Sequence, residues 1–216
     1  MKKGLALILA LVLVLSLAAC GGSSETSMTK EELLDISHPT SIKNISEEAD
    51  SNIARASSTY VDNTYTVWGC VTEIASDTIT LSGYGSCYLR AEMTSDEIMN
   101  LNTGDRIQIV GTISEITEGT ISMKNAHFVT DEYKIENAIG IDITYSRITY
   151  TYICKVVDDN FGHVSFSTNK ITNAQWNKYD GYDFKVSASG KFIKAPNGCE
   201  NDGPFMDDSN FTISDK

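Results

Sequence analysis

The stretches YTVWGCVTEIASDTITLSGYGSCYLRAEM (residues 65–93) and GDRIQIVGTISEITEGTISMKNAHF (residues 104–128) decide the fold. Apolar and polar residues alternate along most of both stretches, which is typical of β-strands with one buried face. Short turns divide the stretches into five candidate strands. The positions expected to face inward in the second to fourth strands are Ile79, Leu81, Cys87, Leu89, Ala91, Met93, Ile107, Ile109, Gly111 and Ile113.

A short helix is predicted between the third and fourth strands, because Thr94 to Glu97 can cap the start of a helix. This helix would be a single turn that ends at Leu101. Three strands, a short helix and two further strands are the element order of the OB-fold, a small Greek-key barrel. Gly69 and Gly111 lie within strands, where a barrel strand must bend sharply. The sequence therefore predicts a mostly β protein with an OB-fold domain over residues 46–130.

A short helical lead-in is expected before the strands. Thr29 and Glu32 form a capping box, and the helix they begin must end before Pro39. A second helix is predicted over residues 46–59, beginning at Ser46, because Ala49, Ile53, Ala56 and Tyr60 recur at helical spacing.

The region 46–130 resembles the bacterial OB-fold family described as tRNA-anticodon-like, which is common in secreted and lipid-anchored proteins. The resemblance implies the barrel fold. The family's name comes from fold similarity and does not establish that the protein binds tRNA. The residues that carry the resemblance are Asn52, Ala54, Ala56, Tyr60, Gly69-Cys70-Val71, Ile74, Leu101, Gly104-Asp105, Val110-Gly111 and Asn125-Ala126.

Residues 139–213 are predicted to be a second, degenerate copy of the same barrel, which gives two tandem barrels. The alternative is an unrelated antiparallel β unit. The matched segments are Cys70–Ile74 with Cys154–Asp158, Thr78–Ser82 with His163–Ser167, Thr94–Ile98 with Thr172–Trp176, Gly104–Ile109 with Tyr182–Val186, and Met123–Phe128 with Asp207–Phe211. OB-folds bind through their second and third strands and through the loops between strands 1 and 2 and between strands 4 and 5, which in the second copy are predicted to be Asp158–Gly162 and Lys194–Pro204. The longer loops Asp158–Gly162 and Lys194–Pro204 therefore favour the second copy as the binding unit.

The N-terminus resembles a bacterial lipoprotein signal. Lys2 and Lys3 precede a run of residues without charges. The run ends in Leu17-Ala18-Ala19-Cys20, which has the form of a lipobox. The resemblance implies a signal peptide over residues 1–19, a diacylglycerol on Cys20, and anchoring at the extracytoplasmic face of the cell membrane. Residues 20–45 are expected to be a lipid-anchored tether. An ordinary secretory signal is the alternative.

Charge limits the choice of partner. Cleavage before Cys20 would leave 15 basic and 29 acidic residues, a formal net charge of −14. This balance argues against nucleic acid, whose binders gather Lys and Arg to displace counterions. An unknown protein, peptide or glycan is the expected partner besides the membrane. The candidate ligand surface comprises Tyr88, Arg90, Asp159, Phe161, Trp176 and Tyr182.

Four further cysteines, Cys70, Cys87, Cys154 and Cys199, are candidates for disulfides, and three pairings are open. Pairing within each copy would join 70 to 87 and 154 to 199, although Cys87 could equally be a buried free thiol. The spacing of Cys and His gives no zinc motif, and no catalytic motif frames a nucleophile. We therefore expect no cofactor, no metal and no catalytic residue.

These features predict a non-catalytic binding or interaction module on a lipid anchor. The alternatives are an envelope-associated enzyme that acts on an extracellular substrate, and a structural component of the envelope.

Overall fold

The computed structural model describes residues 28–179, 184–196 and 204–215. The predicted signal peptide and Cys20 lie outside these residues, as do Tyr182 and Cys199. Among the helices described, none has the length and apolar character required to cross a membrane.

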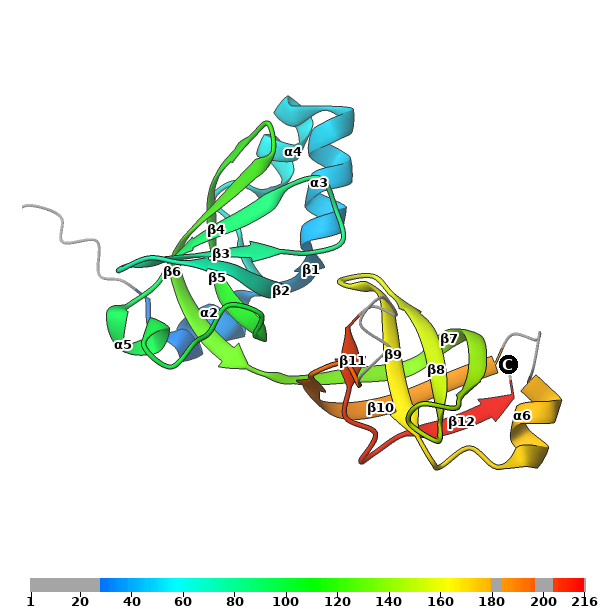
Figure 1. Ribbon diagram of the computed structural model, residues 1–216. Coiled ribbons are helices and arrows are strands. Elements are labelled where there is room, and N and C mark those ends of the chain that lie inside the picture. The colour runs from blue at the N-terminus through cyan, green and yellow to red at the C-terminus, as the bar shows by residue number, and fades with distance from the viewer. Residues whose placement is uncertain (1–27, 180–183, 197–203, 216) are drawn as a thin grey trace, which may run out of the picture.

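The first barrel is a sheet of five strands closed on itself (Figure 1). Its strands are β2 (Thr64–Ile74), β3 (Thr78–Ser82), β4 (Tyr88–Glu92), β5 (Arg106–Thr117) and β6 (Thr120–Thr130). Strands β2, β3 and β4 pair antiparallel in sequence, β4 then pairs parallel with β6, and β5 joins β6 to β2. With α5 (Ser95–Ile98) between β4 and β5, this is the predicted OB-fold order.

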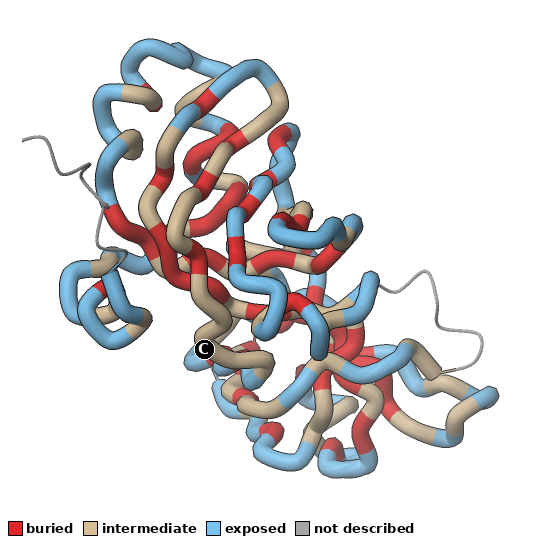
Figure 2. The backbone as a smooth tube through the Cα atoms, turned by 90° about the vertical axis from the view of Figure 1, so that its left-hand side faces the viewer, coloured by how far each residue is buried: buried red, intermediate tan, exposed pale blue. Residues whose placement is uncertain are grey.

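The alternation of the sequence accounts for the core of this barrel. Every residue predicted to face inward is buried, while Tyr88 and Arg90 are exposed on the outer face of β4. Gly69 is needed for packing, since an added Cβ would lie 2.7 Å from the Cβ of Leu81 on the neighbouring strand. Buried positions, red in Figure 2, run through the interior of both barrels.

The lead-in differs from the prediction. The first helix, α2 (Lys30–Ile36), has the expected capping box at Thr29. The predicted helix 46–59 is instead two helices, α3 (Ile42–Ser51) and α4 (Ile53–Tyr60). Ser46 begins no helix: it is buried inside α3, where its hydroxyl accepts the backbone N–H of Cys87 at 3.0 Å.

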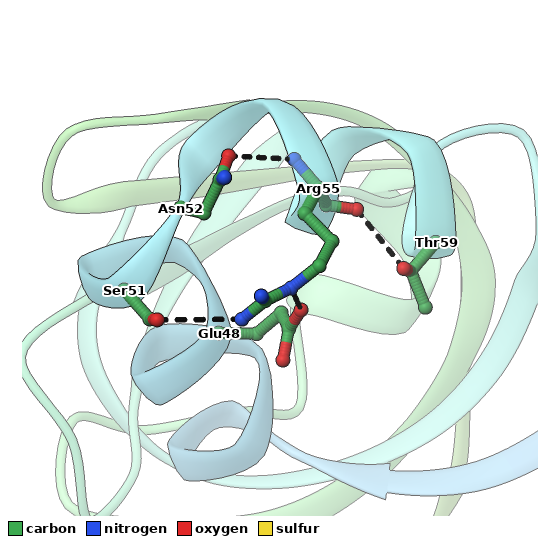
Figure 3. A network of polar contacts seen from close by, with 5 residues as sticks. All are labelled: Glu48, Ser51, Asn52, Arg55 and Thr59. Atoms are coloured by element: carbon green, nitrogen blue, oxygen red, sulfur yellow. Dashed lines mark hydrogen bonds and ion pairs between the residues drawn. The ribbon is translucent and has the colours of Figure 1, made fainter.

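The break between α3 and α4 has a local cause. Asn52 adopts an extended conformation, and its side-chain oxygen accepts the N–H of Arg55 at 3.0 Å, which caps α4. The Arg55 guanidinium reaches back across the break to Glu48 and to Ser51 in α3 (Figure 3). A helical period in sequence cannot reveal this break, because the apolar spacing continues through it.

Most of the described part of the predicted tether belongs to the barrel domain. Leu33, Ile42 and Ile45 are fully buried, and β1 (His38–Ser41) pairs parallel with β2. Residues 30–45 are therefore folded against the first barrel, whose domain begins near residue 30 and not at 46.

The second barrel repeats the topology of the first. Its elements are β7 (Glu132–Ser146), β8 (Thr151–Asp158), β9 (Gly162–Thr168), α6 (Asn173–Tyr179), β10 (Phe184–Ile193), β11 (Phe205–Met206) and β12 (Thr212–Asp215). Strand β9 pairs parallel with β11, and β10 pairs antiparallel with both β11 and β7, which closes the barrel. The protein is thus mostly β with tandem OB-fold-like barrels, as predicted, and the alternative of an unrelated β unit is wrong.

The predicted alignment of the two copies is shifted by one strand at its start. Cys154 lies in β8, the second strand, because the first strand, β7, already begins at Glu132. Only Asp131 separates β6 from β7, so no turn signal marks the boundary between the barrels. The loop Asp158–Gly162 therefore joins the second and third strands and is not the first loop of the barrel.

Candidate functional site: the cleft between the barrels

The residues of the predicted ligand surface do not form one site. Tyr88 and Arg90 lie on the outer face of the first barrel, and Asp159 is exposed in the turn after β8. Trp176 has a structural role in the second barrel, since it packs on Tyr152 and its indole N–H donates to the carbonyl of Ile143 at 3.2 Å. Phe161 packs between the two barrels.

An aromatic cluster joins the barrels, and we define it as Trp68, Tyr133, Phe161 and Phe192. Trp68 on β2 meets Tyr133 edge-on at 4.7 Å between ring centroids, and Tyr133 meets Phe161 at 5.4 Å. Phe161 and Phe192 are 4.9 Å apart. Trp68 lies between Val67 and Gly69, which face the interior of the first barrel, so its side chain points outward. There it packs against the core of the second barrel.

A backbone hydrogen bond also crosses this interface, and polar contacts within the second barrel hold Tyr133 in place. The backbone N–H of Tyr84 donates to the carbonyl of Asn160 in the opposite barrel at 2.7 Å. The Tyr133 hydroxyl donates to Asp158 and accepts from the side-chain amide of Asn160. Burial and the adjacent Asp158 carboxylate raise the pKa of Tyr133 far above its usual value, so the phenol stays protonated. The two barrels are therefore docked through packed and directional contacts.

A cleft of about 920 Å³ lies along this interface. The first barrel and its lead-in contribute charged and apolar side chains, among them Lys30, Asp96, Glu97, Leu101, Asp105, Arg106, Ile107, Phe128 and Asp131. The end of β10 contributes Lys191, Phe192, Ile193 and Lys194. The volume lies within the range of small-molecule sites, which is about 300–1,000 Å³.

Most carboxylates of the cleft already have partners. Glu97 accepts the N–H of Phe128 at 3.1 Å and contacts His127 at 3.2 Å. Asp105 accepts the N–H of Asn102 at 2.7 Å. Asp131 pairs with Lys191 at 2.6 Å, and this hydrogen bond raises the pKa of Lys191.

Arg106 lines the cleft without an ion pair among the described residues. Its guanidinium carbon lies 5.2 Å from the centroid of the Phe192 ring, so the side chain stands between the barrels. One of its terminal nitrogens, Nη1, donates to the carbonyl of Gly104 at 3.3 Å. Its Nε is buried and has no hydrogen-bond partner among the residues described.

The cysteines of the described ranges are free thiols. The Cys70 thiol contacts the carbonyl of Gly104, whereas Cys87 is held against α3 by Ser46, so the predicted pair 70–87 does not form. Cys87 is the buried free thiol that the strand pattern allowed. Cys154 is also free and fully buried, and burial raises the pKa of both Cys154 and Cys70. In these ranges no three His, Cys, Asp or Glu side chains gather where they could hold a metal ion.

The sequence reasoning missed the cleft. Arg106 and Phe192 belong to strands of different barrels, and no local motif marks either residue. Trp68 carried the one local signal, since aromatic side chains that point outward from a strand are enriched at interfaces.

The fold and the cleft define the protein as a pair of tandem OB-fold-like barrels. No protein-family model and no curated protein matches the chain, so the resemblance to the tRNA-anticodon-like family stays a prediction. Among solved structures, the chain is similar to a "putative nucleic acid-binding lipoprotein" from Klebsiella pneumoniae subsp. pneumoniae MGH 78578. The match has 18% identity and a TM-score of 0.41, and covers 48% of this chain and 100% of that chain.

Proposed function

We propose that this protein is a lipid-anchored, extracytoplasmic, non-catalytic binding module that holds its ligand in the cleft between the barrels. The observation that carries the proposal is the cleft itself, which has charged and apolar walls from both barrels. A docked interface keeps these walls in place before any ligand arrives, which lowers the entropic cost of binding.

The lining of the cleft supports binding over catalysis. The described lining residues include no His, Cys or Ser, and two of the four lining carboxylates, Glu97 and Asp105, are engaged by backbone N–H groups. Glu97 accepts the N–H of Phe128 and so ties α5 to β6, and Asp105 accepts the N–H of Asn102 within its own turn. The remaining groups are suited to hold a ligand by charge and by apolar contact.

The partner we propose is a protein, a peptide or a glycan. Nucleic acid is disfavoured, because residues 60–130 of the first barrel hold 3 basic and 9 acidic residues. The lipobox at Cys20 supports an anchor at the extracytoplasmic face of the membrane. Replacing this residue (C20A) is expected to move the protein from the membrane fraction to the soluble fraction.

Photocrosslinking on intact cells tests the binding site. A benzophenone amino acid would replace Ile193 in the cleft in one variant, and Ile139 of the second barrel in a control. The two positions are matched, with 43% and 45% of their side chains exposed. A discrete crosslinked product from position 193 that is missing from position 139 would support the proposal. Equal products, or none, from the two positions would refute it.

A further inference from the structure

The unused hydrogen-bonding capacity of Arg106 points to the chemistry of the ligand. Of its five N–H donors, one finds an acceptor, the carbonyl of Gly104, among the residues described. The Nε–H is buried and closed to a ligand, but the end-on pair of N–H groups, one from Nη1 and one from Nη2, also matches the two oxygens of a carboxylate. Three of the four N–H groups on these terminal nitrogens have no acceptor among the described residues.

Among the described residues, no carboxylate forms an ion pair with this guanidinium. Asp131 is paired with Lys191, while Glu97 and Asp105 accept backbone N–H groups. A guanidinium that lines a cleft without a counter-ion is suited to bind an oxyanion from a ligand.

Two more cations line the cleft without an acidic partner in the described ranges, Lys30 and Lys194. The ammonium of Lys30 lies 6.0 Å from the centre of the Phe128 ring. The cleft therefore offers an anion three cations that have no ion pair, in a protein that is otherwise strongly acidic.

The same wall presents apolar surface beside the cations. Ile193 is 43% exposed and Phe192 is half-buried under the guanidinium, with Leu101 across the cleft. The cations and carboxylates of the lining are equal in number, four of each, which suits a ligand with a single negative charge better than a doubly charged phosphate.

We propose, on the basis of the proposed binding function, that the cleft binds the C-terminal end of a peptide whose last residue is apolar. Arg106 binds the terminal carboxylate, Lys30 and Lys194 add attraction at longer range, and Ile193 and Leu101 contact the last side chain. A carboxylate directly beside an apolar group is the chemistry of such a terminus, whereas the carboxylate of an acidic sugar has hydroxyl groups around it.

The test uses the full-length lipoprotein in detergent and two pools of fluorescent hexapeptides. Both pools have five randomised positions followed by leucine, one with a free carboxylate and the other with a C-terminal amide. Fluorescence anisotropy should show that the amide pool binds about tenfold more weakly, which is the loss expected for one charge-assisted hydrogen-bonded pair.

Variants of Arg106 assign the effect to this residue. R106Q should weaken binding of the acid pool about tenfold and leave binding of the amide pool unchanged. R106K keeps the charge but loses the fork, and should also weaken the acid pool. The control R90Q changes an exposed arginine on β4 and should alter neither pool. Unchanged thermal unfolding of R106Q or R106K would show that the variant is folded.

Several results would overturn the inference. Equal binding of the two pools, or wild-type binding by a folded Arg106 variant, would remove the carboxylate contact. Stronger competition by inorganic phosphate than by acetate would indicate a phosphate ligand. If neither pool binds while crosslinking from position 193 persists on cells, the ligand is not a peptide terminus, although the binding module stands. If both fail, the proposed function fails as well.

Discussion

Replacing Trp68 with alanine tests whether the two barrels form one docked unit. Trp68 reaches from β2 into the second barrel, where its ring centroid lies 4.7 Å from that of Tyr133 and 6.3 Å from that of Phe161. Each edge-to-face pair contributes about 0.5–1.5 kcal/mol beyond the burial of its area. Two such pairs and the loss of part of a half-buried indole give about 2–4 kcal/mol of lost coupling between the barrels.

Differential scanning calorimetry of the full chain measures this coupling. For a barrel of this size, 1 kcal/mol corresponds to a Tm shift of about 4–8 °C. We expect the wild type to unfold in one transition. In W68A, the second barrel should unfold separately, roughly 10 °C lower. The exposed Tyr88 serves as the control, since Y88A removes an aromatic ring that contacts no other ring in the described ranges, and should leave the profile unchanged.

One result would refute this reasoning. If W68A unfolds in a single transition within about 1 °C of the wild type, the Trp68 contacts contribute less than roughly 0.3 kcal/mol and do not dock the barrels. The cleft would then lack a fixed second wall, and the argument for a preorganised site would fail with it.

Three further predictions concern the second barrel. G140A should lower its unfolding free energy by about 3 kcal/mol or more in urea, because the new Cβ would lie 1.8 Å from the buried Phe184 ring. The pKa of Tyr133 is higher in the folded protein than in the unfolded chain, so stability should fall as the pH rises above about 10. The fall should be less steep in Y133F, which has no phenol to ionise beside Asp158. The Cys154 thiol should resist alkylation at pH 8 in the native protein and react once it is unfolded in urea, as peptide mapping by mass spectrometry would show.

The alternation of apolar and polar residues predicted most of the fold. Ile79 and Leu81 are buried, as their alternation required, and the side chains between inward positions of β4 are exposed. The pattern failed where local signals are silent. No turn separates β6 from β7, so the sequence predicts a start at residue 139 for a barrel that begins at Glu132. The helix break at Asn52 was missed because a capping side chain can interrupt a helix without changing the apolar period.

Sequence patterns predicted less of the candidate site than of the fold. The sequence indicated Phe161 as a ligand contact, but its ring packs against Trp68 of the opposite barrel and Phe192 of its own. Loop length and exposed aromatic residues are local features, and neither can tell a ligand surface from an interface between domains.

The sequence by itself determined the two β-rich units, the inward face of the first barrel's strands, the capped first helix and the acidic balance. These follow from periodicity, caps and charge, which are properties of neighbouring residues. Only the tertiary structure decided that the barrels meet through Trp68 and that Arg106 stands over Phe192 with unused donors. The reason is physical: both contacts join residues distant in sequence, and their geometry depends on how two closed barrels pack.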